Sequence, residues 1–539
     1  MHRWTAGLAS LALVSGCQGS NGDRSGPRDE VGETDVLTGS CDVAFAALPE
    51  IRGNDPLFPL SRAVAVHLSG AARLLLTATD AEGEEVRWAS PSAPAHDLPL
   101  VGLHADGEWT LTISAFDESD CEVTAEPVTF ATDPLPTPLP HLTLRASVPE
   151  SMEPGLTVIP IYTKDISYIA LVDADGRIVW LYGPTVPKFT EIVPLPDGHL
   201  LALTDSDVIE FDWMGVVRVR SSQSSKEASS EPLEAPDFHH DMLISSRGTL
   251  VALTKGSLVV SEFPGSEEID GVFAETKVAV DLITEFAADG SIAAQWDVTT
   301  MLDLKRLGFD SLTQASEGVE WSHVNAVVED TVNNRWILSA RNQDAVFAVR
   351  QSDGGVDWIL GNHDNWHAEH SDLLLDRDGD TFEWQYHQHA CKYDAATNRV
   401  MVFDNGNYRS SPWTDADPPM PPSASYSRIV EYTIDETSRT VHQNWDFRLI
   451  PGVFSFAMGD ADWLPNGNVL ADFAYVEWEG GEPMETLGRG HNSFRVVEFD
   501  PATGAVIWDL DVWGDLATED PNAWQAYRTQ RIPRPFAAP

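Results

Sequence analysis

One pattern of β structure recurs along most of this chain, and it restricts the fold more than any other feature. Each copy reads as an apolar strand, a turn, a second apolar strand, and further strands that lead into the next copy. The copies span 169–180, 192–217, 239–296, 323–358, 387–445 and 460–508. Four-stranded units at this spacing are typical of β-propeller blades. The sequence therefore predicts an all-β fold with a six-bladed β-propeller over 150–515, and seven blades are the alternative.

The ends of the copies carry two further signals. The first copy, 169–180, lacks inner strands, so we expect the ring to close by joining terminal segments of the chain. Five of the six copies end on a tryptophan, namely Trp180, Trp296, Trp358, Trp445 and Trp508. We interpret these large aromatic side chains as packing within and between blades rather than as a cage for a ligand.

Three other segments flank the repeat. Residues 40–131 alternate apolar and polar side chains, with turns about every ten residues, which predicts a small N-terminal β-sandwich domain. The Pro-rich stretch 132–149 is interpreted as a linker, because proline and the residue before it disfavour regular structure. Residues 516–539 are interpreted as a C-terminal tail.

The N-terminus has the features of a processing signal. Arg3 precedes a short apolar run, and the run ends in Val-Ser-Gly-Cys at 14–17. This ending resembles the bacterial lipobox, so 1–17 is expected to be a lipoprotein signal peptide, with Cys17 lipidated and becoming the mature N-terminus. The polar stretch 18–39 would then act as a flexible tether. An ordinary secretory signal with an incidental cysteine is the alternative.

This interpretation predicts the location and the disulfide chemistry of the protein. Gln18, rather than Asp, follows the cysteine, and such lipoproteins resemble those sent to the outer membrane. We expect an exported, lipid-anchored protein at the outer membrane or its periplasmic face. Cys41 and Cys121 bracket the small β region and are the expected disulfide, because that compartment is oxidising. Cys391 is then left over and is interpreted as a small buried residue.

The charge balance excludes one class of partner. Acidic residues outnumber basic ones by 84 to 34, which gives a formal net charge of −50. Such a surface repels phosphate backbones, so nucleic-acid binding is not expected. A membrane contact is expected only through the lipid anchor.

Histidines stand at equivalent places in successive copies. They open FHHDMLI at 238–244, WSHVNAVV at 321–328 and YHQHACKYD at 386–394. Polar groups at equivalent starts of successive β repeats usually point toward one shared axis. The sequence therefore predicts a site at the centre of the propeller.

The side chains at this centre suit one kind of chemistry. Residues two apart on a strand share a face, so His323 is expected to point with Asn325, and His387 with His389. Arg341 lies at the far end of the next strand, within reach of the same opening. Imidazole can attack or protonate near neutral pH, and a guanidinium binds anionic oxygens. This set suits transfer of a compact tetrahedral anion, with no metal and no cofactor.

The order of these motifs resembles a known family. H-H-D, W-x-H-x-N, S-x-R-N-Q-D, Q-H and F-D-N-G-N, followed by Y-S-R-I-V-E-Y, are similar to the bacterial arylsulfate sulfotransferases over roughly 150–515. The resemblance implies a six-bladed propeller with an N-terminal β-sandwich, a periplasmic location, and transfer between an aryl sulfate and a phenol without a nucleotide donor.

The resemblance also implies roles for individual residues. His389 matches the nucleophile that becomes transiently sulfated. His323 and Arg341 match further catalytic positions, and Asn325 matches a residue that binds the sulfuryl group.

Two assignments depend on residues that are close neighbours. The earlier catalytic histidine of the family falls on His239 or His240, and we favour His240 because it directly precedes Asp241. His387 departs from the family pattern. It either binds substrate and shapes the pocket, as we expect, or competes with His389 as the nucleophile.

Several alternatives stay open. The chain could be a non-catalytic propeller that binds ligands at the cell surface, or a propeller hydrolase or lyase. A homodimer is a candidate assembly. His363, His367 and His370 have the spacing of a helical metal site, but their loop context favours a structural role. Asp376, Asp378 and Asp380 are interpreted as a solvated turn, because no Glu closes a calcium loop there.

Overall fold

The computed structural model describes residues 41–53, 55–185, 188–195, 198–204, 206–222, 231–233, 237–414, 418–479, 482–483, 491–514 and 524–537. Within these ranges the regular elements are strands and short 3-10 helices, which confirms the all-β prediction. The 3-10 helices are η1 (Pro149–Ser151), η2 (Val298–Thr300), η3 (Arg341–Gln343), η4 (Ala368–Leu373) and η5 (Pro422–Ala424). No described helix is long and apolar enough to cross a membrane. The predicted signal peptide with Cys17 and the tether lie outside the described residues.

The N-terminal strands form one connected sheet. They are β1 (Glu50–Arg52), β2 (Arg62–Asp80), β3 (Glu85–Leu100), β4 (Glu108–Phe116), β5 (Glu122–Thr124) and β6 (Val128–Ala131). β2 pairs with β3 on one edge and with β4 along its second half, and its register with β3 shifts between His67 and Ala72. Such a break bends a strand, so the sheet can fold over one apolar core. Cys41 and Cys121 form a disulfide here, with Cα atoms 5.5 Å apart, as the sequence predicts.

The described residues from 141 onward form six further sheets, which we name blades I to VI in chain order. Blade I contains β8 (Leu156–Tyr162), β9 (Ser167–Val172), β10 (Ile178–Thr185), β34 (Gln525–Ala526) and β35 (Gln530–Ile532). Blade II contains β11 (Glu191–Pro194), β12 (Leu200–Leu203), β13 (Asp207–Phe211), β14 (Val217–Ser222) and β15 (Glu231–Pro232). Blade III contains β16 (Phe238–Ile244), β17 (Leu250–Pro264), β18 (Phe273–Phe286) and β19 (Ile292–Asp297).

The second half of the ring follows the same plan. Blade IV contains β20 (Val324–Asp330), β21 (Arg335–Ala340), β22 (Ala345–Arg350) and β23 (Val356–Gly361). Blade V contains β24 (Asp376–Asp378), β25 (His389–Asp394), β26 (Arg399–Asp404), β27 (Arg428–Asp435) and β28 (Thr440–Phe447). Blade VI contains β29 (Asp460–Trp463), β30 (Val469–Glu479), β31 (Glu482–Pro483), β32 (His491–Asp500), β33 (Ala505–Trp513) and β7 (His141–Ser147).

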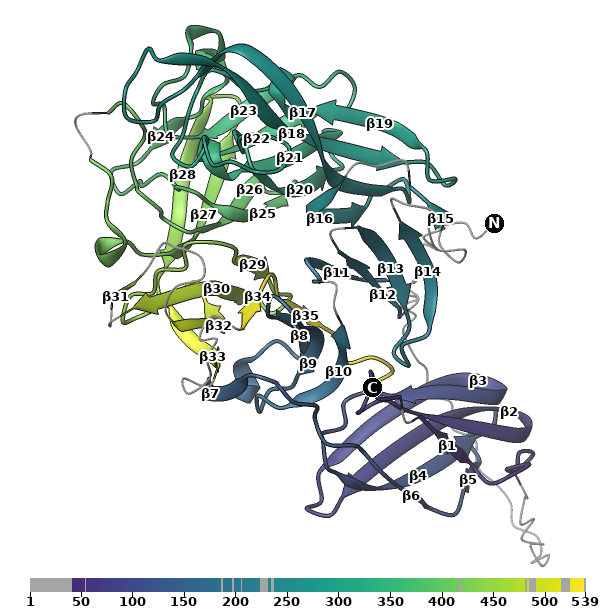
Figure 1. The fold of residues 1–539 in the computed structure, drawn as a ribbon. Coiled ribbons are helices and arrows are strands. Elements are labelled where there is room, and N and C mark those ends of the chain that lie inside the picture. The colour runs from purple at the N-terminus through teal and green to yellow at the C-terminus, as the bar shows by residue number, and fades with distance from the viewer. Residues whose placement is uncertain are drawn as a thin grey trace, which may run out of the picture.

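The blades lie in chain order around the propeller (Figure 1). The first strands of blades II to VI contact one another in sequence, β11 with β16, β16 with β20, β20 with β25, and β25 with β29. β34 contacts β30 of blade VI and pairs with β8 of blade I. On the other side of blade I, Gln530 donates a hydrogen bond to the carbonyl of Ile192 in blade II, at 2.8 Å. The two ends of the repeat region thus meet through the C-terminal strands.

Segments that the sequence assigns to a linker and a tail carry propeller strands. β7, inside the predicted linker 132–149, is the outermost strand of blade VI, where it pairs with β33. β34 and β35, inside the predicted tail 516–539, complete blade I by pairing with β8. The expectation that terminal segments close the ring is therefore confirmed. The interpretations of 132–149 as only a linker and of 516–539 as only a tail are corrected, because propeller strands lie on both sides of the predicted range 150–515.

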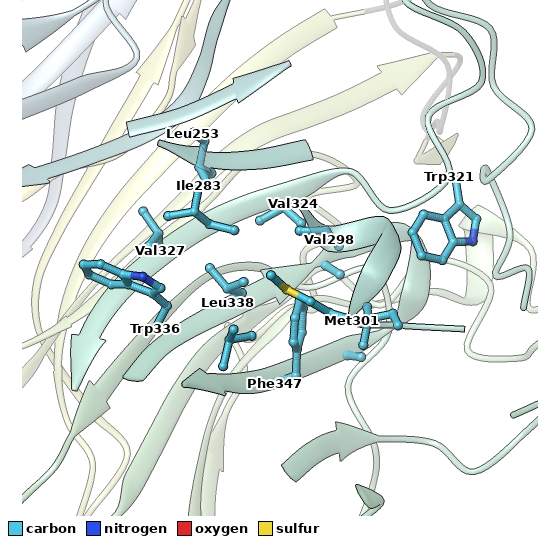
Figure 2. Packing of buried hydrophobic residues seen from close by; sticks show 14 of the residues in the cluster. Leu253, Ile283, Val298, Met301, Trp321, Val324, Val327, Trp336, Leu338 and Phe347 are labelled. Carbon is cyan, nitrogen blue, oxygen red and sulfur yellow. The ribbon is translucent and has the colours of Figure 1, made fainter. Parts of the chain in front are cut away.

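Apolar packing between blades III and IV fixes one of the histidine segments (Figure 2). Trp321 and Val324 flank the pair Ser322–His323, and both are fully buried in this core. The Trp321 indole nitrogen donates a hydrogen bond to the carbonyl of Arg306 at 2.8 Å. Since the segment is anchored on both sides of His323, the core determines where this histidine lies.

Candidate active site

Carboxylates from one blade hold the loops that carry histidines in the next. Asp281 of β18 accepts hydrogen bonds from the backbone nitrogen of Val324 at 2.8 Å and from the Ser322 hydroxyl at 2.6 Å. Asp344, just before β22, accepts one from the backbone nitrogen of His387 at 2.7 Å. These bonds satisfy backbone groups that would otherwise be buried without partners, so they fix the start of each inner strand.

The histidine loops use left-handed backbone conformations. The φ angles of His240, His323 and His387 are 55°, 47° and 51°. Such angles are uncommon for residues with a side chain and indicate a conformation imposed by the surroundings. Strand alternation does not hold across such a residue. As a result, His387 and His389 have different neighbours, although the sequence predicts that they share a face.

Three of the predicted catalytic residues lie together. The ring centres of His240 and His323 are 4.8 Å apart, and those of His240 and His389 are 6.0 Å apart. The ring of Tyr527 packs against two of them, 5.3 Å from His389 and 6.1 Å from His240. We call His240, His323 and His389 the histidine trio. They come from blades III, IV and V, as expected for side chains that converge on the propeller centre.

The hydrogen bonds of His389 define its tautomer. Its Nδ1 lies 2.7 Å from the carbonyl oxygen of Gly459, which can only accept, so Nδ1 carries the proton. Nε2 is buried and has no hydrogen-bond partner in the described part of the chain. Burial lowers the pKa of this ring well below its usual range, and the charge of Arg528 adds to the effect. His389 is therefore a neutral imidazole with a free lone pair on Nε2.

A chain of imidazoles defines the tautomer of His240 in the same way. His239 lies 3.3 Å from the carbonyl of Thr254 through Nε2, so that nitrogen donates and its Nδ1 accepts. The His240 Nδ1 is 2.9 Å from His239 Nδ1 and must be the donor of that bond. Burial lowers the pKa of His239 to about 4 and that of His240 well below its usual value. His240, rather than His239, contacts the other two members of the trio.

His323 has a carboxylate partner. Its Nδ1 lies 2.7 Å from Oε2 of Glu320, and the other oxygen of Glu320 accepts a hydrogen bond from Nζ of Lys255 at 2.9 Å. Burial opposes the charge of Glu320, but His323 and Lys255 outweigh it and hold the pKa of this carboxyl well below its usual range. A carboxylate partner on Nδ1 orients the imidazole and leaves Nε2 directed elsewhere, which suits a general acid and base.

Arg341 and Asn325 are tied to the same loops. Arg341 donates from its backbone nitrogen to the carbonyl of His323 at 3.1 Å and from Nη1 to Asp310 at 3.2 Å. Asn325 is buried and donates from Nδ2 to the carbonyl of Gln388, the neighbour of His389, at 2.9 Å. Its Oδ1 has no hydrogen-bond partner among the described residues. Arg341 is thus tied to the trio through its backbone, and Asn325 through a side-chain bond to the residue before His389.

Tyr527 and Arg528 belong to the site and are missed by the sequence reasoning. Arg528 donates to the carbonyl of Asn325 at 2.6 Å and pairs with Glu191 at 2.8 Å and Asp241 at 3.1 Å. Arg528 thus links the C-terminal segment to blades II, III and IV. The first copy of the repeat lacks inner strands, so a terminal segment has to fill that place near the centre of the propeller. This feature of the sequence could have indicated that residues near the C-terminus contribute to the site.

His387 is separated from the trio. Its Nε2 lies 3.1 Å from the carbonyl of Phe309, and its ring lies 5.3 Å from that of Tyr408. Its Nδ1 faces Asp344 at 3.1 Å. Nε2 therefore has a hydrogen-bond acceptor, and Nδ1 lies at ion-pair distance from a carboxylate without hydrogen-bond geometry, which differs from the surroundings of His389. Direct substrate binding by this buried ring remains a prediction. The charged groups that lie beside His387 in the structure are the carboxylates of Asp310 and Asp344.

The histidines considered for a metal do not converge. His363 lies 2.9 Å from the carbonyl of Leu375, and His367 pairs with Asp303. Among the described residues, neither this group nor the Asp376–Asp378 strand forms a cluster with metal-ligand spacing. Asp80, Glu84 and His104 do have such spacing, far from the trio in sequence, but Arg177 already binds both oxygens of Glu84.

Similar solved structures show only distant likeness. They include a putative 6-phosphogluconolactonase from Bacteroides fragilis, at 12% identity and a TM-score of 0.30, covering 86% of this chain and 98% of that one. Apo AztD from Citrobacter koseri is 9% identical with a TM-score of 0.28 and the same coverage.

Sequence relatives are more informative. Arylsulfate sulfotransferase AssT of Escherichia coli O6:H1 is 27% identical over 370 residues, and AssT of Lelliottia amnigena is 29% identical over 374 residues. Each alignment covers 59% of this chain and 56% of the relative, so the chain spans little more than half the length of these proteins. The family model of the arylsulfotransferases matches residues 142–528, a range that contains the whole site. The chain therefore belongs to the arylsulfotransferase (ASST) family.

Proposed function

We propose that this chain is an aryl-sulfate sulfotransferase that moves a sulfuryl group from a phenolic sulfate ester to a phenolic acceptor by a ping-pong mechanism. The observation that supports it most is the state of His389, a neutral imidazole whose Nδ1–H is bound by Gly459 and whose Nε2 has no partner. A free imidazole lone pair beside two further histidines is what covalent transfer requires. Membership of the arylsulfotransferase family supports the transfer of a sulfuryl group from an aryl ester.

In the first step, Nε2 of His389 attacks the sulfur atom of the donor. An N–S bond forms while the S–O bond to the aryl oxygen breaks, and that oxygen leaves with the electron pair. His323, held by Glu320, gives the leaving oxygen a proton, so a phenol is released. Arg341 and Asn325 stabilise the sulfuryl oxygens by charge and hydrogen bonding. Because Nε2 is covered, donor binding must displace neighbouring side-chain atoms.

In the second step, the acceptor phenol takes the sulfuryl group from the sulfohistidine. His323, now neutral, removes the phenolic proton as the oxygen attacks sulfur, and the N–S electron pair returns to Nε2. The protein ends in its starting protonation state. As in phosphoryl transfer, positioning and charge stabilisation supply most of the acceleration, so the scheme needs neither metal nor cofactor.

Two measurements test this function. The first follows phenol release from a chromogenic aryl sulfate with and without a phenol acceptor. The second is the intact mass of the protein after exposure to donor alone, where a gain of one sulfuryl group is expected. A binding module would release no phenol. A hydrolase would yield free sulfate even when phenol is abundant, and either result would contradict the proposal.

We also propose that the chain is exported and anchored by a lipid on Cys17. The support is the basic start, the short apolar run and the Val-Ser-Gly-Cys ending of the first 17 residues. Replacing Cys17 with Ser should release a soluble exported protein from the membrane fraction. Unchanged fractionation would show that the cysteine is incidental.

A further inference from the structure

Four charged residues form a row beside the histidine trio. Nδ1 of His387 lies 3.1 Å from Oδ1 of Asp344, and its Nε2 lies 3.6 Å from Oδ2 of Asp310. Arg341 donates from Nη1 to the same Asp310 oxygen at 3.2 Å. Negative and positive charges therefore alternate along the row Asp344–His387–Asp310–Arg341, which we call the charge row. Only its Arg341 end has a role in the proposed reaction.

The middle of the row is a fixed cation. The His387 side chain is fully buried, and Nε2 must donate to the carbonyl of Phe309 at 3.1 Å. Nδ1 faces a carboxylate that is itself fully buried. An imidazole between a carbonyl and a carboxylate is best satisfied when both nitrogens carry protons. His387 therefore acts as a buried positive charge rather than as a nucleophile or a base.

Asp310 is held from several sides. Its Oδ1 accepts a hydrogen bond from the Tyr408 hydroxyl at 3.2 Å, and its backbone carbonyl accepts one from Nδ2 of Asn342 at 3.2 Å. Its own backbone is left-handed, with φ of 65°. The second carboxylate oxygen of this fixed side chain, Oδ2, accepts the hydrogen bond from Nη1 of Arg341 at 3.2 Å.

We propose that Asp310, held in turn by His387, is the positioning residue for Arg341 in sulfuryl transfer. The inference rests on the proposed function and extends it to residues that do not touch the sulfuryl group. Nη1 of Arg341 donates to Asp310 at 3.2 Å and to Oδ1 of Asn342 at 2.8 Å, and the backbone of Arg341 is tied to His323. Because this end of the guanidinium is held, the orientation of its other N–H groups is restricted, while the charge of His387 offsets that of Asp310.

A purely structural ion pair would make a different prediction. If Asp310 only stabilised the fold, its replacement would lower the melting temperature and the fraction of the protein that becomes sulfated, while the rate constant of sulfation per folded molecule would stay unchanged. A positioning role instead lowers that rate constant. Asp310→Asn keeps the Arg341 cation, so donor binding should survive, whereas the aim of the guanidinium, needed as charge moves in the transition state, should be lost.

The test uses the full-length protein, a chromogenic aryl sulfate and the rate of the mass gain on donor alone. Asp310→Asn should slow sulfation about tenfold or more while changing the donor KM by less than about twofold. Asp310→Glu should recover most of the lost rate. Arg341→Lys, by contrast, should raise the donor KM as well, because a single ammonium group replaces a planar guanidinium that can bind two oxygens at once. Asp378→Asn, an exposed carboxylate near His442, is the matched control and should leave both constants unchanged.

The outcomes separate this inference from the proposed function. Sulfation by Asp310→Asn at nearly the wild-type rate, or no recovery in Asp310→Glu, would overturn the positioning role. A wild type that gains no sulfuryl group would overturn the function itself. If Asp310→Asn does not fold, Tyr408→Phe removes one bond to Asp310 and should slow sulfation severalfold at constant donor KM. An unchanged rate in that variant would also refute the inference.

Discussion

The histidine trio and the charge row place the same residue type in two opposite states. His389 in the trio has one nitrogen bound to a carbonyl and the other free, and burial lowers its pKa well below the usual range. His387, two residues earlier, is equally buried. Although burial and Arg341 oppose its charge, Asp344 and Asp310 prevail and raise its pKa to about 9.

The difference teaches that burial alone does not decide the charge of a histidine. Desolvation disfavours the charged ring at both positions, and the groups facing the second nitrogen decide the outcome. A carboxylate there makes an imidazolium, as at His387, while the absence of an acceptor leaves a lone pair, as at His389. Changes at His389, Gly459, Glu320 and His387 test this contrast.

The largest effect is expected from His389→Ala. This change removes the free lone pair, so phenol release and the mass gain on donor should fall by at least about 10³-fold. Intact-mass spectrometry and a phenol assay measure the two quantities. If His389→Ala still became sulfated while His387→Ala did not, the nucleophile would lie two residues earlier and the contrast between the two histidines would be reversed.

A large effect is also expected from moving the carbonyl that fixes the His389 tautomer. Gly459 has φ of 100°, and a Cβ there would lie 2.6 Å from the ring of Phe403. Gly459→Ala should therefore shift the carbonyl and slow sulfation by about 100-fold, as a misplacement near 1 Å can do.

Gly467, in the same blade, provides the matched control. Its φ is 93°, but a Cβ added there meets nothing within 4 Å. Gly467→Ala tests backbone strain alone, so it should lower the melting temperature and leave the sulfation rate unchanged. Equal rates in the two variants would mean that the Gly459 carbonyl does not hold His389.

A smaller effect, which depends on the substrate, is expected from Glu320→Gln. The change removes the charge that supports a proton on His323, so release of a poor phenolic leaving group should slow by about ten- to a hundredfold. A good leaving group, such as a nitrophenol, needs little protonation and should be affected much less. A rate loss that is the same for both donors would show that Glu320 does not act through proton transfer.

The sequence could predict the trio because its residues lie at equivalent places in a repeat. His240, His323 and His389 open three successive copies, and the repeat itself implies that such positions converge. The ring contacts agree with the choice of His240 over His239, which the sequence analysis bases on the neighbouring Asp241.

The charge row could not be predicted from the sequence. The shared face expected for His387 and His389 assumes strand geometry, but β25 begins only at His389 and His387 has a positive φ. Asp310 and Glu320 come from the irregular segment between blades III and IV, where periodicity carries no information. Tyr527 lies in the segment interpreted as a tail, so only the unfilled place in the first copy pointed to it.

The smallest effect on the rate is expected at His387, where the effect on stability should instead be distinctive. The pKa of this ring is about 9 in the folded protein and 6.5 in an ordinary setting. Its contribution to stability is therefore fully present below pH 6.5 and is lost as pH rises through about 9. The difference corresponds to about 3 kcal/mol at most.

The groups that face His387 explain why its pKa is raised and why stability falls as pH rises. Asp344 and Asp310 favour the charged ring and Arg341 opposes it, while the Tyr408 ring packs beside it.

His387→Gln keeps a donor for the Phe309 carbonyl but has no charge to lose. Urea unfolding at pH 6, 8 and 10 should show a wild-type decline across this range that is much reduced in the variant. His442→Gln, an exposed histidine, should keep the wild-type decline. Parallel curves for wild type and His387→Gln would mean that His387 is neutral in the folded protein, and the charge row would then lack its central cation.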